Sequence, residues 1–184
     1  MEKGKDQPYI TLNDGNKMPQ IGLGTFLSKD PTELEEVIKS AILQNGYRHL
    51  DCAWVYGNEE TVGKALKHCF DQGIKREDIF VTTKMIPSQN ERIEDSLKES
   101  LKWLQLEYVD LYLVHTVCPR IDFETNEVSG PPLHEVWAEF ERLREIGLTK
   151  SIGVSNCPVA VYLNMLAYAK VKPAVNQIEV HTYF

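Results

Sequence analysis

Strand and helix patterns alternate along the chain, and this alternation constrains the fold more than any other feature. The first predicted helix begins after Asp30, a capping residue with Pro31 next to it. Its apolar stripe at helical spacing consists of Leu34, Val37, Ile38, Ala41 and Ile42. The predicted strands are dense in apolar residues, as strands buried on both faces between helices are. The sequence therefore predicts an α/β protein with a parallel sheet.

An N-terminal hairpin with an Asp14-Gly15 turn precedes the main sheet. Predicted strands of that sheet cover residues 21–25, 47–50, 79–83, 109–114, 151–154 and 174–178. Helices are predicted between them, one capped by Asn58 and one that begins near Ser88. A longer loop is expected at residues 116–132. We interpret residues 1–184 as one domain, which a chain of this length can form around a single core.

Two architectures have a buried parallel sheet of this kind, an open doubly wound sheet and a (β/α)₈ barrel. A doubly wound sheet that binds dinucleotides carries G-x-G-x-x-G in its first turn. Gly22 and Gly24 lack the third glycine of that pattern. Reactive residues at the ends of several strands fit the barrel better, because barrels place their chemistry there.

The composition excludes several classes of protein. The chain has 184 residues, 42% of them hydrophobic, and a net charge of −7, which argues against binding to nucleic acid or to an anionic membrane surface. No apolar run is long enough to span a membrane, and no apolar segment of a signal peptide follows residues 1–6. The four cysteines form no C-x-x-C pair and are expected to be reduced. We expect a cytoplasmic protein without a metal site.

Four reactive side chains follow consecutive predicted strands: Asp51, Tyr56, Lys84 and His115. If the strands are parallel neighbours, all four meet at one rim. A free phenol, with a pKa of about 10, is a poor acid at neutral pH, and a nearby ammonium favours its ionised form. Lys84 is the candidate cation, Asp51 its partner, and neutral His115 a group that orients a substrate oxygen. Together they predict a proton relay for a carbonyl being reduced.

Each residue alone also has an ordinary structural interpretation. Asp51 fits an ion pair or a helix cap, Tyr56 fits packing, Lys84 fits a solvated surface position, and His115 fits a core histidine. The convergence of all four at one rim favours the functional interpretation.

The pattern from Asp51 to Glu59, with Lys84 ending a Val-Thr-Thr-Lys strand and His115 ending the strand from Asp110, resembles the aldo-keto reductase superfamily. The resemblance extends from about residue 9 to residue 184 and includes three further signatures in the family's order. These are Gly22-Leu23-Gly24-Thr25, Gly153-Val154-Ser155-Asn156 and Asn176 to His181.

The resemblance implies a (β/α)₈ barrel that reduces aldehydes or ketones with NADPH, or with NADH. Tyr56 would be the general acid, Lys84 and Asp51 would tune it, and His115 would orient the carbonyl. The residues expected to contact the cofactor are Thr25, Asp51, Ser155, Asn156 and Gln177. The residues expected to contact the substrate are Phe26, Trp54, Tyr56, His115 and Thr116. Trp54 also fits ordinary packing, and Ser155-Asn156 also fits a helix cap before Pro158.

The resemblance also implies a barrel truncated after its sixth strand, since a complete barrel takes about 250 residues. Open sheet edges would then expose unpaired backbone groups. We expect the isolated chain either to be poorly stable or to pair these edges with another copy or with a missing fragment. Two alternatives to a reductase remain open at this point. One is a non-catalytic binding or regulatory module, and the other is a lyase or isomerase that uses Lys84 as a nucleophile.

Overall fold

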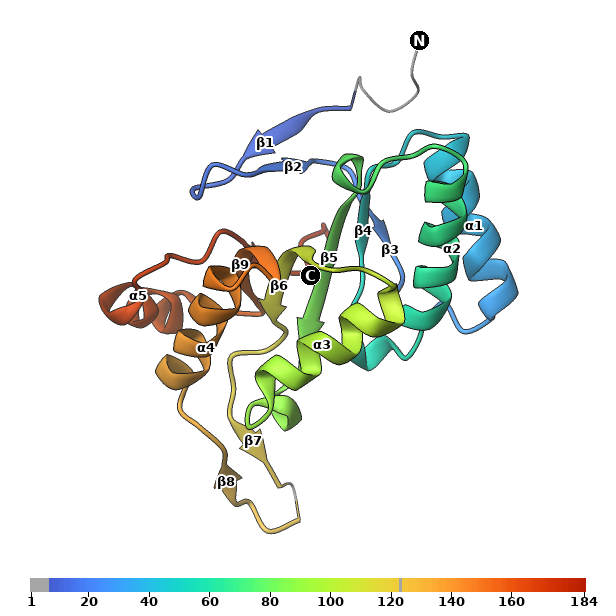
Figure 1. Cartoon of the computed structure of the whole chain (residues 1–184). Coiled ribbons are helices and arrows are strands. Elements are labelled where there is room, and N and C mark those ends of the chain that lie inside the picture. Colours follow the sequence, from blue (N-terminus) through green and yellow to red (C-terminus); the bar gives the residue numbers. More distant parts are fainter. Residues whose placement is uncertain (1–6, 123) are drawn as a thin grey trace.

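The computed structural model describes residues 7–122 and 124–184, so the N-terminal hexapeptide considered above lies outside the described residues. The main sheet is parallel throughout, with the order β10-β9-β6-β5-β4-β3 (Figure 1). Its strands are β3 (Leu23–Gly24), β4 (His49–Asp51), β5 (Phe80–Met85), β6 (Val109–Val114), β9 (Thr149–Ser155) and β10 (Asn176–Gln177). The spatial order follows the chain without reversal, as in a barrel, whereas a doubly wound sheet reverses its order at a switch point.

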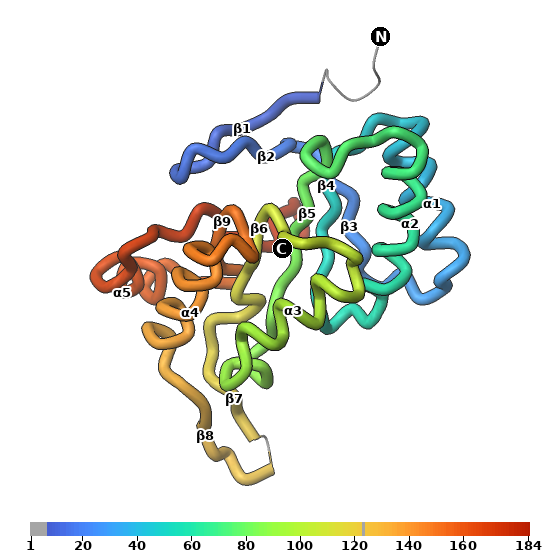
Figure 2. Tube along the Cα trace, in the orientation of Figure 1, coloured from blue at the N-terminus to red at the C-terminus, as the bar shows by residue number. Residues whose placement is uncertain are grey.

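Five helices among the described residues pack along this curved sheet, and Figure 2 traces the same path along the backbone. They are α1 (Pro31–Leu43), α2 (Glu59–Asp71), α3 (Ile93–Leu104), α4 (Leu133–Glu145) and α5 (Val159–Tyr168). Three short 3₁₀ turns interrupt the connections, namely η1 (Trp54–Tyr56), η2 (Arg76–Asp78) and η3 (Pro87–Gln89).

The helix starts follow the sequence prediction in one case and depart from it in two. Asp30 caps α1 as predicted, because its Oδ1 accepts hydrogen bonds from the main-chain N–H groups of Thr32 and Glu33, at 2.8 and 3.1 Å. Asn58 precedes α2 but makes no side-chain cap bond. The helix expected near Ser88 begins at Ile93, because the Gln89 side chain accepts a hydrogen bond from the Ile86 N–H and closes a separate turn.

Two apolar clusters hold the layers together. The larger one lies between the outer face of the sheet and the helices, and in it Trp137, Phe140 and Tyr112 stack in sequence. The smaller cluster consists of Leu12, Phe80, Leu111 and Leu113. Residues that alternate along β5 and β6 thus pack on opposite faces of the sheet, as strand geometry requires.

The N-terminal hairpin lies across the end of the sheet where the strands begin (Figure 1). It pairs β1 (Tyr9–Thr11) with β2 (Lys17–Pro19) in the predicted antiparallel arrangement. At the opposite end, the predicted loop of residues 116–132 contains a further short hairpin, β7 (Arg120–Ile121) and β8 (Val128–Ser129), which projects from the body (Figure 1). Residue 123 in this loop lies outside the described residues.

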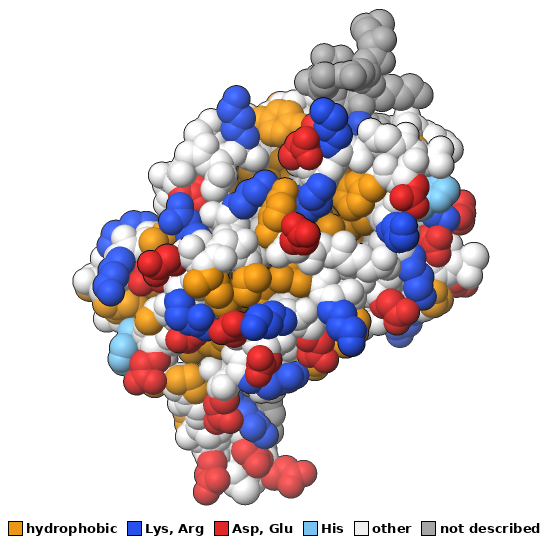
Figure 3. All heavy atoms as spheres, viewed as in Figure 1, with side chains coloured by type: hydrophobic (Ala, Val, Ile, Leu, Met, Phe, Trp, Pro, Cys, Tyr) orange, Lys and Arg blue, Asp and Glu red, His pale blue; other side chains and the backbone are white. Residues whose placement is uncertain are grey.

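In the described part of the chain, β3 and β10 each pair with one neighbouring strand. The predicted self-association through these edges stays a prediction. The face in Figure 3 carries acidic and basic side chains side by side, with small apolar groups between them. No helix among the described residues is long and apolar enough to cross a membrane.

The contact between α2 and α3 requires a glycine. A Cβ added at Gly63 would lie 2.2 Å from the Trp103 carbonyl oxygen and 2.8 Å from the Leu104 carbonyl carbon, and backbone atoms cannot rotate away. We therefore expect Gly63→Ala to lower the free energy of unfolding by roughly 1–3 kcal/mol or more, despite about 1 kcal/mol of gained helix propensity. Urea unfolding measures this. Lys64→Ala, at an exposed neighbouring position, should stay within about 0.5 kcal/mol of the wild type.

Candidate active site

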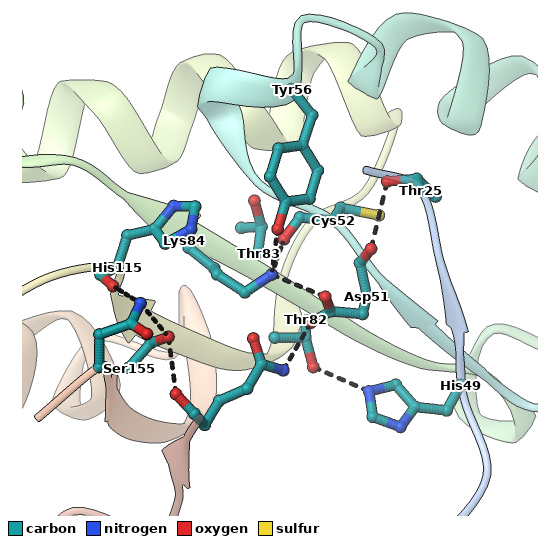
Figure 4. A network of polar contacts seen from close by, with 12 residues as sticks. Thr25, His49, Asp51, Cys52, Tyr56, Thr82, Thr83, Lys84, His115 and Ser155 are labelled. Carbon is teal, nitrogen blue, oxygen red and sulfur yellow. Dashed lines mark hydrogen bonds and ion pairs between the residues drawn. The ribbon is translucent and has the colours of Figure 1, made fainter. Parts of the chain in front are cut away.

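A buried lysine ammonium lies at the centre of the site. Lys84, near the end of β5, has a side chain 1% exposed, and its Nζ donates three hydrogen bonds. The acceptors are Asp51 Oδ2 at 2.8 Å, the Cys52 carbonyl oxygen at 2.8 Å and Tyr56 Oη at 3.2 Å (Figure 4). An ammonium has three N–H donors, so all of its donors are used. The structure therefore brings together three of the four residues predicted to form the relay.

Tyr56 reaches Lys84 from η1, the turn after β4, and Figure 4 shows its phenol pointing at the ammonium. The phenol ring packs against two aromatic neighbours. The Phe26 ring lies 4.9 Å away, centroid to centroid, and the His115 ring lies 5.8 Å away, edge to face. Phe26 is itself 63% exposed, so it forms one wall of an open space beside the phenol.

His115 follows β6 and is the fourth predicted member of the cluster. Burial, and next the Lys84 ammonium, lower the pKa of His115, while the Asp51 carboxylate opposes this shift. The imidazole is thereby kept neutral near pH 7, and its Nδ1 is buried without a hydrogen-bond partner among the described residues. A neutral imidazole can donate a hydrogen bond to a substrate oxygen from one of its two nitrogens.

The predicted cofactor residues Ser155, Asn156 and Gln177 lie at the ends of β9 and β10, beside the relay. Gln177 Nε2 donates to Asp51 Oδ1 at 2.9 Å, which joins β10 to the far side of the relay. Ser155 Oγ donates to the Gln177 carbonyl oxygen at 2.8 Å, and Asn156 Nδ2 donates to the His115 carbonyl oxygen at 2.9 Å. Asn156 has a left-handed backbone (φ 52°), which asparagine tolerates better than most residues. These hydroxyl and amide groups match the donors and acceptors of a carboxamide, so they fit the nicotinamide end of the expected cofactor.

Thr25 contacts the relay at Asp51, whereas Thr116 is the residue after His115. Thr25 is buried, and its N–H and Oγ1 both donate to the Asp51 carbonyl oxygen, at 3.0 and 3.2 Å. It thereby fixes the end of β3 against Asp51. Thr116 is half-buried and borders an apolar cavity of about 320 Å³ beneath the β7–β8 hairpin. A second cavity, of about 360 Å³, is lined by Tyr56, Phe26 and Lys29.

Trp54 is placed differently from the substrate-pocket position predicted for it. Its indole N–H donates to Glu99 Oε2 on α3 at 3.0 Å, and its ring stacks on Trp103 at 6.4 Å. These contacts fit the packing alternative. The reason is local, because Trp54 and Tyr56 occupy different positions of a 3₁₀ turn with three residues per turn, so their side chains leave in different directions.

Two polar contacts of the site involve residues to which the sequence assigned no role. The Cys52 carbonyl oxygen holds Lys84, and a main-chain acceptor has no side-chain signal in a sequence. Glu59 is buried against Thr83, although an acid in the first turn of a helix indicates only a favourable charge at a helix end. No cluster of three metal-ligating side chains occurs in the ranges that the structure describes.

Comparison with known proteins agrees with this fold. The protein-family model described as "Aldo/keto reductase family" matches residues 20–184. Aldose reductase C of Dictyostelium discoideum is 44% identical over 94% of this chain and 59% of its own length. The NADP-dependent D-sorbitol-6-phosphate dehydrogenase of Malus domestica is 42% identical over 95% of this chain and 60% of its own length.

Solved structures resemble the chain equally well. A Bombyx mori aldo-keto reductase in complex with NADP superposes with a TM-score of 0.87 and 36% identity, over 95% of this chain and 58% of that one. The aldose reductase of Schistosoma japonicum gives a TM-score of 0.88 and 38% identity, over 96% and 62%. The predicted fold class, an incomplete (β/α)₈ barrel, is confirmed. The chain thus spans about three fifths of the length of these relatives, and it belongs to the aldo/keto reductase family.

Proposed function

We propose that this protein reduces aldehydes or ketones to alcohols, with NADPH as the hydride donor and Tyr56 as the general acid. The observation that carries the proposal is the buried Lys84 ammonium, which donates to both Asp51 and the Tyr56 phenol beside His115. Relatives named aldose reductase, and a similar structure solved with NADP, support the same chemistry.

In the proposed reaction the substrate carbonyl oxygen lies between Tyr56 Oη and the His115 ring, where both can donate hydrogen bonds to it. When bound, NADPH would supply the hydride that the carbonyl carbon receives. Negative charge then develops on the substrate oxygen, and the Tyr56 proton moves to it. The Lys84 ammonium stabilises the phenolate left behind, and Asp51 balances the buried positive charge. The substrate gains one hydride and one proton, which yields the alcohol.

The amide and hydroxyl groups of Ser155, Asn156 and Gln177 would hold the nicotinamide carboxamide. Thr25 would contribute through Asp51, whose carbonyl oxygen it binds. Phe26 lines the same cavity as Tyr56, and Thr116 directly follows His115 in the chain, so both would contact the substrate. Phe26 offers an aromatic wall and Thr116 a small polar one, which suits a substrate with an apolar body.

A lyase or isomerase with Lys84 as nucleophile has less support. An amine nucleophile needs an accessible nitrogen lone pair, whereas Lys84 Nζ donates to three acceptors and its side chain is only 1% exposed. Borohydride trapping of a carbonyl compound on Lys84 would favour this alternative.

Tyr56→Phe removes the proposed acid while keeping the ring. We expect aldehyde reduction with NADPH to fall in kcat by on the order of 10²–10⁴-fold, because the transition state loses its proton donor. The melting temperature should change little. Oxidation of NADPH, followed by its absorbance, is the measurement. Tyr183→Phe, at an exposed tyrosine, is the control and should keep full activity. Retention of most activity by Tyr56→Phe would contradict the assignment.

We expect the 184-residue chain to bind NADPH weakly, with a dissociation constant of about 1 μM or more. The three proposed carboxamide contacts are neutral hydrogen bonds, worth about 0.5–1.5 kcal/mol each. Fluorescence titration measures the constant. Gln177→Leu should weaken binding further, whereas Gln20→Leu, at an exposed position after β2, should not. Submicromolar binding, or equal binding by the two variants, would contradict the proposed contacts.

The low pKa of His115 gives a prediction that needs no substrate. In an NMR titration we expect His115 to gain its proton below the ordinary value of about 6.5, because burial and the Lys84 charge disfavour the imidazolium. Lys84→Met should raise this pKa, since it removes the cation and leaves Asp51. Lys67→Met, at an exposed position on α2, is the control. An unchanged His115 pKa in Lys84→Met would rule out the electrostatic coupling.

A further inference from the structure

Glu59 is a buried acid that the relay described above does not use. It is the first residue of α2 and is only 1% exposed. Its Oε1 accepts a hydrogen bond of 2.5 Å from the Thr83 hydroxyl on β5. Burial raises the pKa of Glu59, and the Thr83 hydrogen bond partly offsets the rise. Burial of a carboxyl group lowers the stability of the fold unless other contacts compensate for it, so the buried position of Glu59 needs an explanation.

A favourable charge at the helix N-terminus is an insufficient reason. Glu60, the next residue of α2, is in the same first turn, where the helix dipole favours an acid. Its side chain is 69% exposed, and it pairs with Lys64 in solvent. The first turn of α2 therefore already has an acid that is not buried. Glu59 differs from it by its burial and by its contacts with Thr83 of β5 and Ser100 of α3.

The contact of Glu59 with Thr83 joins the two segments that carry the proposed acid and its cation. Glu59 is three residues after Tyr56, and Thr83 is the residue before Lys84. Successive residues of a strand point to opposite faces, so Lys84 faces the relay while Thr83 faces the helices. The hydrogen bond of Glu59 with Thr83 thus fixes, from behind the sheet, the two segments whose side chains meet in front of it.

Asn58 secures the same segment on its other side. Its Nδ2 donates to the carbonyl oxygens of Thr25 and Ser28, at 2.8 and 3.3 Å. The turn that carries Tyr56 is therefore tied to the end of β3 by Asn58 and to β5 by Glu59. With both ties in place, the phenol cannot shift along β5 without breaking a buried hydrogen bond.

We propose that Glu59 is a positioning residue whose hydrogen bond with Thr83 sets the separation of the Tyr56 phenol and the Lys84 ammonium. It acts through geometry and touches neither substrate nor cofactor. Its value to catalysis rests on the proposed function, but the alignment itself can be measured without turnover.

The experiment compares Glu59→Gln, Glu59→Ala and Thr83→Val in the full 184-residue chain. Glutamine keeps an oxygen that can accept from Thr83, while alanine and valine each remove one partner of the bond. The readout is the NMR signal of the Tyr56 ring, assigned by its loss in Tyr56→Phe. This signal is sensitive to the Phe26 and His115 rings that pack on it. We expect it to move in Glu59→Ala and Thr83→Val and to stay in place in Glu59→Gln.

Matched controls separate positioning from general destabilisation. Glu60→Ala and Glu60→Gln change the exposed neighbour. Thr82→Val removes a buried hydroxyl from the same strand, where it lies 3.0 Å from His49 Nε2. We expect Thr82→Val to lower the melting temperature about as much as Thr83→Val and to leave the Tyr56 signal unchanged.

Two outcomes would overturn the proposal. One is an unmoved Tyr56 signal in Thr83→Val, and the other is a signal in Glu59→Gln that moves as far as in Glu59→Ala. If Glu59→Ala does not fold, the Tyr56 signal in Thr83→Val tests the proposal by itself. Where the reductase is active, Thr83→Val should lower kcat on the order of tenfold or more with little change in KM, since a small misplacement of reacting groups is costly. An inactive wild type would count against the proposed function and leave the NMR result valid.

Discussion

The buried ammonium of Lys84 is the interaction on which the other polar contacts of this site depend. A charge at this depth persists only when every donor has a partner, and removal of one partner of a buried ion pair costs about 3–5 kcal/mol. Asp51, Cys52 and Tyr56 meet this requirement from the end of β4 and the turn after it. Gln177 then binds the second Asp51 oxygen and extends the network to β10. A single charge thereby orders the ends of three strands.

The two faces of β5 contact different parts of the molecule. The inner face presents Lys84 to the relay, and the outer face presents Thr83 to Glu59. Because one strand carries both, a contact in the helix layer fixes the geometry of the site. This arrangement accounts for a carboxyl group buried between α2 and β5, where an apolar side chain would otherwise be expected.

The sequence predicted the elements more reliably than the directions of individual side chains. Asp51, Lys84 and His115 were expected to meet because parallel strands end at one rim, and the structure has them there with Tyr56. The resemblance assigned Trp54 to the substrate pocket, and the local pattern assigned Asn58 to a helix cap. Trp54 instead binds Glu99, and Asn58 binds the Thr25 and Ser28 carbonyl oxygens. Those partners are distant in the chain, so local spacing carries no information about them.

By itself, the sequence determined the alternation of strands and helices, the cap at Asp30 and the set of reactive side chains at the strand ends. These follow from periodicity and from short-range hydrogen bonds, which act within one turn or one strand. Three hydrogen bonds were decided by the tertiary structure alone. They are those of Lys84 with the Cys52 carbonyl oxygen, of Gln177 with Asp51, and of Thr83 with Glu59. Each of these contacts joins segments that are separated in the chain and become neighbours only in the folded protein. Burial then selects the partner, because buried polar groups are stable only when they form hydrogen bonds.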